Sequence, residues 1–292
     1  MTMEDKSYYQ EQLEAKNDML ARTTDYMNQI ENLLTEKNLH LVDLQRGVSD
    51  SINFAKLIQT SLLPDANILK VFFKDAAYKV VQKIGIGGDT IFIKNTNSGI
   101  IFCLLDATGH GIPGAMLSIS GTLILNDIIS SIEIDDPAVL LKFLNYRLHK
   151  TFRNDKNSIA HFEGIVFYYS SINNKLSYSS AKGKGFLFNS TGNIISLASS
   201  KTSIGENLNT NFDTFDVPFQ KGEKLILFSD GLIDQFGGEQ DKKYTTSRLK
   251  KLLVNNSEKT VSELIEIIYE ECFSWKGDGE QTDDLSFKII EF

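Results

Sequence analysis

Cysteine is scarce in this chain, which has two among 292 residues. Two cysteines cannot build a disulfide framework, and the apolar sequence around Cys103 and Cys272 indicates buried small hydrophobic residues. The sequence shows no Ser–His–Asp pattern, no cysteine nucleophile pattern and no GxxxxGK[ST] phosphate loop. These absences argue against hydrolases that use a side-chain nucleophile and against P-loop nucleotide enzymes.

An excess of positive charge is also missing, since the net charge is −8 and the pI is about 5.1. A nucleic-acid-binding surface needs a basic face to neutralise phosphates, so we expect no nucleic-acid partner. The apolar runs are far shorter than the about 20 residues of a membrane span. The N-terminal sequence MTMEDKSYYQEQ contains no apolar signal core. We therefore expect a cytoplasmic protein without membrane insertion, which receives any sensory input from a partner.

Glycine and proline are absent from residues 5–46, which are rich in Glu, Lys, Gln, Asn and Leu. Apolar residues recur there every seven positions, with a partial second stripe three residues later. The main stripe consists of Leu13, Leu20, Met27, Leu34, Leu41 and Val48. The pattern predicts a parallel coiled coil over residues 1–46 that forms a homodimer. The alternative is a single amphipathic helix that folds back on its own domain.

A second helical segment follows Gly47, which we expect to interrupt the first helix softly. Its apolar residues keep helical spacing until Pro64 ends the pattern. We interpret residues 47–66 as a connector helix between the coiled coil and a domain formed by residues 67–292.

Residues 67–292 alternate between short apolar runs and two pairs of amphipathic segments. Asp136 and Thr260 are predicted helix N-caps, the latter within the capping box Thr260-Val-Ser-Glu263. Strands are predicted at 78–84, 90–94, 99–105, 164–172, 176–180, 185–189, 194–197, 224–228 and 285–290, and helices at 113–129, at 137–152 and after Thr246 and Thr260. Strands around paired helices, without a βα repeat, indicate an α+β fold.

Four short acidic motifs stand at or near the ends of apolar runs: IGGD, LLDATGHG, LFSDG and TDDLSF. Isolated carboxylates at strand ends are energetically unfavourable unless a cation binds them. Mg²⁺ and Mn²⁺ prefer oxygen ligands. A site for two ions needs a bridging ligand. Asp106 is the best candidate because it ends a strand, and Ala107 could add its backbone carbonyl. The motifs thus predict a metal-dependent hydrolase.

Other polar residues near these motifs allow two interpretations each. His110 is either a general acid or a turn histidine that hydrogen-bonds locally. Lys182 and Lys184, in the sequence AKGKG, either meet a substrate phosphate or belong to a solvated loop. His161 and Glu163 precede a predicted strand and are interpreted as peripheral.

From about residue 48 to residue 292 the chain resembles the metal-dependent PPM-type Ser/Thr protein phosphatases of the bacterial SpoIIE/RsbU type. The matching stretches, in the order typical of that family, are SINFAKLIQTSLLP, IGGD, DATGHGIPGAMLS, LFSDGLIDQFGG and WKGDGEQTDDLSF. The resemblance implies a four-layer α/β/β/α sandwich with two Mn²⁺ or Mg²⁺ ions between the sheets. It also implies that a metal-bound hydroxide attacks the phosphorus of a phosphoserine or phosphothreonine.

The resemblance assigns roles to residues of this chain. Asp106 resembles the bridging ligand and Ala107 the carbonyl ligand, whereas Asp89 resembles the outer ligand of the first motif. Asp230 and Asp283 resemble the ligands of the two later motifs, with Asp284 as the alternative to Asp283. Relatives carry GDFYD or GDFYW at the first motif, and Phe92 here replaces the second acidic residue of the former.

The resemblance further implies a phosphorylated signalling protein as substrate, such as an anti-sigma-factor antagonist, and an upstream sensor protein. The two helices after Asp106 resemble the regulatory switch helices of the family. The competing hypothesis is a catalytically weak or inactive dimeric signalling scaffold that retains the phosphatase fold.

Overall fold

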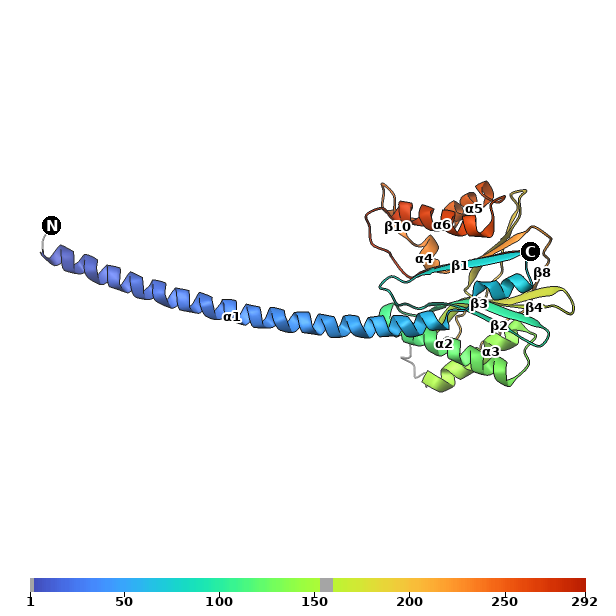
Figure 1. Cartoon of the computed structure of the whole chain (residues 1–292), viewed down its shortest axis with the longest axis horizontal. Helices are drawn as coiled ribbons and strands as arrows, with labels where there is room; N and C mark the ends of the chain where they lie inside the picture. Colours follow the sequence, from blue (N-terminus) through green and yellow to red (C-terminus); the bar gives the residue numbers. More distant parts are fainter. Residues whose placement is uncertain (1–2, 153–159) are drawn as a thin grey trace. The chain divides into compact units, whose positions relative to one another are not determined.

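The computed structural model of the chain describes residues 3–152 and 160–292. The contacts between residues divide the chain into two units, 1–53 and 54–292. Helix α1 (Met3–Leu62) provides the whole of the described part of the first unit and enters the second (Figure 1). It continues through Gly47, where we predicted a soft interruption. A single glycine costs a helix interior about 1 kcal/mol relative to alanine, which the many regular turns on either side absorb.

The stripe of apolar residues on α1 is exposed over the first unit. Leu13, Leu20, Met27, Leu34 and Leu41 each expose 57–64% of their surface. The helix therefore presents the heptad positions to its surroundings and does not bury them within the described part of its own chain.

The second unit contains two five-stranded sheets within the described residues, and all their strand pairs are antiparallel. The first has the order β1-β12-β9-β6-β7 and the second the order β2-β3-β4-β5-β8. The strands are β1 (Asp75–Val81), β2 (Asp89–Asn95), β3 (Gly99–Ala107), β4 (Phe162–Ser170), β5 (Lys175–Ala181), β6 (Lys184–Phe188), β7 (Ile194–Ser196), β8 (Phe215–Val217), β9 (Lys224–Phe228) and β12 (Leu285–Glu291), with a separate pair of β10 (Phe236–Gly237) and β11 (Lys242–Lys243).

Helices cover the outer face of each sheet. Helices α2 (Gly111–Ser131) and α3 (Pro137–Phe152) pack on the second sheet, and α6 (Val261–Lys276), next to α5 (Thr246–Asn255), packs on the first (Figure 1). The short helices η1 (Ala66–Val71) and α4 (Asp230–Ile233) complete the described elements. The predicted α/β/β/α sandwich is confirmed.

Alternation along the strands separates three hydrophobic cores. On β2, Ile91 and Ile93 face the other sheet, whereas Phe92 between them packs under α2 and α3. On β9, Leu225 and Leu227 join the core between the sheets, and Ile226 joins the core under α5 and α6. Because successive side chains of a strand point to opposite faces, each of these two strands contributes to two layers. Polar side chains at the strand ends on the inner faces are thereby brought between the sheets.

Several predicted boundaries agree with the structure. β9 has the predicted limits, and α6 begins at the predicted capping box, in which Thr260 and Glu263 each bind the other's backbone N–H. Asp136 accepts a hydrogen bond from the N–H of Ala138 in the first turn of α3. The predicted strand 78–84 lies instead at Asp75–Val81, because residues 82–88 form a loop.

α2 is long and apolar enough to cross a membrane by length and composition, with a mean hydropathy of 1.4. Within this structure 44% of its most apolar 18-residue stretch is buried, and a single such helix is weak evidence for a membrane span. Both cysteines are free and buried, as the sequence indicated. Burial raises the pKa of the Cys103 thiol to about 12.

Candidate metal centre

Three carboxylates lie in a row across neighbouring strands of the second sheet. Asp89 on β2 lies directly opposite Asp106 on β3, which in turn lies opposite Glu163 on β4. Directly opposite residues of antiparallel strands share a face of the sheet. The antiparallel register thus brings the first two acidic motifs together and adds Glu163, which the sequence analysis placed at the periphery.

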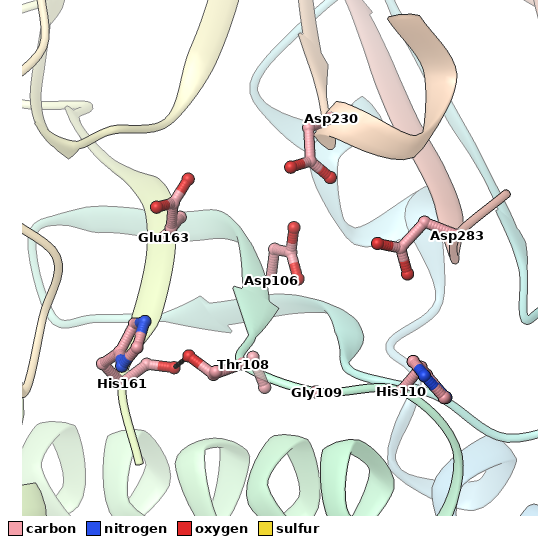
Figure 2. A pocket seen from close by; sticks show the side chains of 9 residues that line it. Asp106, Thr108, Gly109, His110, His161, Glu163, Asp230 and Asp283 are labelled. Atoms are coloured by element: carbon pink, nitrogen blue, oxygen red, sulfur yellow. Dashed lines mark hydrogen bonds between the residues drawn. The ribbon is translucent and has the colours of Figure 1, made fainter. Parts of the chain in front are cut away.

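The first sheet supplies two further carboxylates from the opposite side. Asp230 opens α4 immediately after β9, and Asp283 stands just before β12, the strand next to β9. Figure 2 shows the side chains of Asp106, Asp230 and Asp283 turned toward one another. They line a cavity of about 350 Å³ together with Ala107, Thr108, Gly109, His110, His161 and Glu163.

Asp284 has a different task from its neighbour. One of its carboxylate oxygens accepts a hydrogen bond from the N–H of Lys83 at 2.8 Å and the other from Gly88 at 2.7 Å. The residue is 4% exposed and does not line the cavity. It holds the loop before Asp89, which leaves Asp283 as the member of the pair that faces the cavity.

The loop of residues 82–88 is also held from α1. The side-chain amide of Gln59 donates to the carbonyl of Gly87 at 2.6 Å and accepts from its N–H at 3.3 Å. The same amide donates to the hydroxyl of Ser118 on α2 at 2.8 Å. Gln82 adds a hydrogen bond to the carbonyl of Asp89 at 3.0 Å. The position of Asp89 therefore depends on α1, on α2 and on Asp284, which precedes β12.

The backbone after β3 packs tightly against the same loop. A Cβ atom on Gly88 would lie 2.4 Å from the carbonyl oxygen of Ala107, so only glycine fits at position 88. Thr108 fixes the next turn by donating its N–H and its hydroxyl to the carbonyl of His161, at 2.9 and 2.8 Å. The ring of His110 lies at the edge of the cavity and turns away from the three aspartates (Figure 2).

The clustered carboxylates resist ionisation in the absence of a cation. Burial, and then the charges of Asp89, Asp230 and Asp283, raise the pKa of Asp106 to about 10. Burial likewise raises the pKa of Asp89 well above its usual range. The hydroxyls of Ser229 and Ser286 lower the Asp89 pKa in part, although neither makes a hydrogen bond of good geometry to it.

The carboxylate oxygens of this cluster are suitable ligands for hard divalent cations. Both carboxylate oxygens of Asp89 are buried without a hydrogen-bond partner in the described part of the chain. Buried charges in proteins are paired or coordinate metals, and carboxylates are preferred ligands of Mg²⁺ and Mn²⁺. Among residues 3–152 and 160–292, no three Asp, Glu, His or Cys side chains are already gathered tightly enough to hold an ion. The aspartates approach one another without enclosing a closed site.

Residues 96–292 match the family model described as Stage II sporulation protein E (SpoIIE). The chain belongs to the SpoIIE family. The match includes Asp106, Asp230 and Asp283, whereas Asp89 precedes it. The PPM-type protein-serine/threonine phosphatase class predicted for the enzyme is thereby confirmed. No curated protein sequence matches the chain.

Solved PP2C-type domains share the fold of this SpoIIE-family chain. The SiaA-PP2C domain of Pseudomonas aeruginosa superposes with a TM-score of 0.77 at 21% identity, over 85% of this chain and 98% of that one. The PP2C phosphatase domain of SpoIIE from Bacillus subtilis, with a fragment of its regulatory domain, superposes with a TM-score of 0.63 at 15% identity. The match covers 75% of this chain and 63% of that one. The RsbU and RsbW domains of Rv1364c from Mycobacterium tuberculosis superpose with a TM-score of 0.61 at 17% identity. That match covers 74% of this chain and 59% of that one. This chain thus spans less than two thirds of the last two structures.

Sequence reasoning missed the residues that act through neighbours. Gln59 lies in an ordinary amphipathic stretch, and only the fold places it beside Gly87. Glu163 could have been found from its position one residue into a strand that pairs with the strand of Asp106. That signal depends on strand order and register, which the sequence pattern alone does not supply.

Proposed function

We propose that this chain is an active phosphoprotein phosphatase that hydrolyses phosphoserine or phosphothreonine with two Mn²⁺ or Mg²⁺ ions. The observation that carries the proposal is the convergence of Asp106, Asp230 and Asp283 from two sheets on one cavity, with the pKa of Asp106 raised to about 10. A carboxylate whose ionisation is disfavoured by burial and by neighbouring acids is stabilised in its charged form by a cation. RsbX, another protein of this fold (TM-score 0.54, 15% identity), was crystallised in complex with magnesium.

Each residue has a proposed part in holding the ions. Asp106 would bridge the two ions, and Asp230 and Asp283 would be further carboxylate ligands. Asp89 would be the outer ligand, and the backbone carbonyl of Ala107 would supply another oxygen. When bound, such ions neutralise phosphoryl charge and lower the pKa of water. The hydrogen bonds of Asp284 and Gln59 fix the loop that precedes Asp89 and so orient its carboxylate.

The proposed role of His110 as a general acid rests on its place in the cavity wall. A His110→Ala variant that loses only the basic limb of the pH–rate profile would support this role. A variant with an unchanged profile would leave His110 as a turn residue.

Hydrolysis of phosphopeptides with and without Mn²⁺ tests the proposed function directly. The wild-type chain should be active only with the ion, and Asp106→Asn should lose at least about 10³-fold, as expected when a bridging ligand is lost. Absence of hydrolysis by the wild type, with Asp106→Asn giving the same result, would instead favour a non-catalytic signalling scaffold with the phosphatase fold.

We further propose a homodimer through the coiled coil of residues 1–46. Its support is the exposed heptad stripe from Leu13 to Val48, which a second copy of the helix would bury. Light scattering should report a dimer for the full chain and a monomer after deletion of residues 1–46. An unchanged mass after deletion would place the interface elsewhere.

The proposed substrate is a phosphorylated signalling protein, such as an anti-sigma-factor antagonist, in the cytoplasm. An upstream sensor protein would act through α1, and residues 47–66 would connect the two regions. Capture of the phosphoprotein on the Asp106→Asn variant, compared with the dephosphorylated protein, tests the substrate class.

A further inference from the structure

Lys182 adopts a backbone conformation that lysine seldom takes. Its φ is +56°, in the left-handed region that favours glycine and asparagine. The residue follows β5, and its N–H donates to the carbonyl of Ser200 at 3.2 Å. A lysine in such a position carries a small strain, which suggests that its side chain has a use.

The neighbouring backbone fixes this turn against β4. A Cβ atom on Gly183 would lie 2.4 Å from the backbone of Gly164, so the two glycines are in close contact. Gly164 also forms an isolated bridge with Lys182. Since Glu163 precedes Gly164, the turn places the lysine beside the carboxylate that lies opposite Asp106.

Two carboxylates hold the ammonium group of Lys182 at the rim of the site. Its Nζ lies 3.2 Å from Glu163 and 3.6 Å from Glu206. Ser203 fixes both acids, because its N–H donates to Glu206 at 2.9 Å and its hydroxyl to Glu163 at 3.4 Å. The ammonium is therefore held in place despite 35% side-chain exposure.

The position of this ammonium suits an anion that approaches the aspartates. Lys182 lines a small cavity together with Asp106, Glu163 and Asp230, three residues that also line the main cavity. Lys184 lines the small cavity too, so a second cationic residue belongs to this rim. A lysine has three N–H donors. Its contacts with the two carboxylates are ion pairs, at 3.2 and 3.6 Å, so N–H donors remain for an incoming anion.

We propose that Lys182 is a substrate-binding residue whose ammonium group donates a hydrogen bond to a non-bridging oxygen of the phosphoryl group. This inference rests on the proposed phosphatase function. It assigns recognition of the phosphate to the AKG turn, where the sequence left a solvated loop as the alternative. The anion bound there is a phosphate monoester or inorganic phosphate, because the contact involves the phosphoryl oxygens and not the protein that carries them.

Lys182→Asn is the informative substitution, since asparagine accepts a positive φ and the variant should fold at least as stably as the wild type. Binding of inorganic phosphate to the full chain, loaded with Mg²⁺, is measured by calorimetry and requires no turnover. A charge-assisted hydrogen bond is worth about 10- to 100-fold in affinity, so the dissociation constant should rise by that factor. The KM for p-nitrophenyl phosphate should rise in parallel, with a smaller change in kcat.

Two further variants make the result specific. Lys182→Arg keeps the positive charge and should recover most of the affinity for phosphate. Lys175→Asn removes an exposed ion pair of similar length, Lys175 to Asp216 at 3.0 Å, and should bind phosphate like the wild type. Wild-type phosphate affinity in Lys182→Asn, an equal loss in Lys175→Asn, or no phosphate binding by the wild type would each overturn the proposal. Failure of the proposed function shows separately, as absence of ion-dependent hydrolysis by the wild type.

Discussion

Gln59 and Gly87 exchange two hydrogen bonds, so that the end of α1 holds the backbone two residues before Asp89. Gln59→Ala should lower the free energy of unfolding by about 1–3 kcal/mol, because a buried N–H loses its partner. It should also weaken Mn²⁺ binding, since the loop that carries Asp89 loosens. Calorimetric Mn²⁺ titration and urea denaturation measure the two effects. Gln45→Ala, at an exposed position of the same helix, is the matched control. Unchanged Mn²⁺ affinity in Gln59→Ala would separate α1 from the site.

The adjacent acids Asp283 and Asp284 should respond differently to the same substitution. Asp283→Asn removes a carboxylate from the cavity and should weaken Mn²⁺ binding by at least about tenfold with little loss of stability. Asp284→Asn replaces a carboxylate that binds two backbone N–H groups, and should cost about 1–3 kcal/mol of stability. Metal titration and thermal unfolding of the pair decide the assignment. The reverse order of effects would make Asp284 the ligand.

Asp106→Asn should stabilise the metal-free protein while abolishing its activity. The folded state raises the pKa of Asp106 to about 10, so it retains a proton that the unfolded chain releases above about pH 4. Stability from this group is therefore full below pH 4 and declines as the pH rises toward 10. Removal of the carboxyl should add on the order of 1–3 kcal/mol at pH 8 and almost nothing at pH 4. Urea denaturation in EDTA at both pH values measures the difference. A destabilised variant at pH 8 would show that burial and the neighbouring charges do not keep Asp106 protonated.

Lys288→Met should stabilise the core between the sheets. Lys288 is fully buried, its ammonium has no hydrogen-bond partner among the described residues, and it lies 5.2 Å from the centre of the Phe102 ring. Burial lowers the pKa of Lys288 to about 7, so between pH 7 and about 10.5 the unfolded chain holds a proton that the folded state lacks. Wild-type stability should therefore rise with pH through that window.

The Lys288→Met variant lacks this dependence and should gain about 1–4 kcal/mol at pH 7, with the gain shrinking toward pH 10.5. Thermal unfolding should show an increase of about 2–4 °C per kcal/mol. Lys224→Met is the matched control, because that buried ammonium donates to the carbonyl of Ser257 at 2.8 Å. The control should lose stability. Equal loss in both variants would mean that Lys288 has a partner after all.

Local sequence patterns predicted the elements whose signals are local. The capping box at Thr260 and the N-cap at Asp136 were found because each lies within four residues of the groups that it binds. The aspartates were found because they end apolar runs. What the pattern could not supply was pairing between distant segments, and therefore the row from Asp89 to Glu163. Nor could it distinguish Asp283 from Asp284, since one residue of register decides which of them faces the cavity.

The position of β12 in its sheet has a consequence for synthesis. β12 (Leu285–Glu291) lies between β1 and β9, although some 200 residues separate β1 from β12 along the chain. Asp283, which lines the same cavity as Asp106, is thus synthesised after every described strand except β12 itself. Until then, β1 and β9 have no strand between them and the aspartates of the second sheet face an incomplete layer. The cavity between the two sheets is therefore complete only after residues 283–291 have been synthesised.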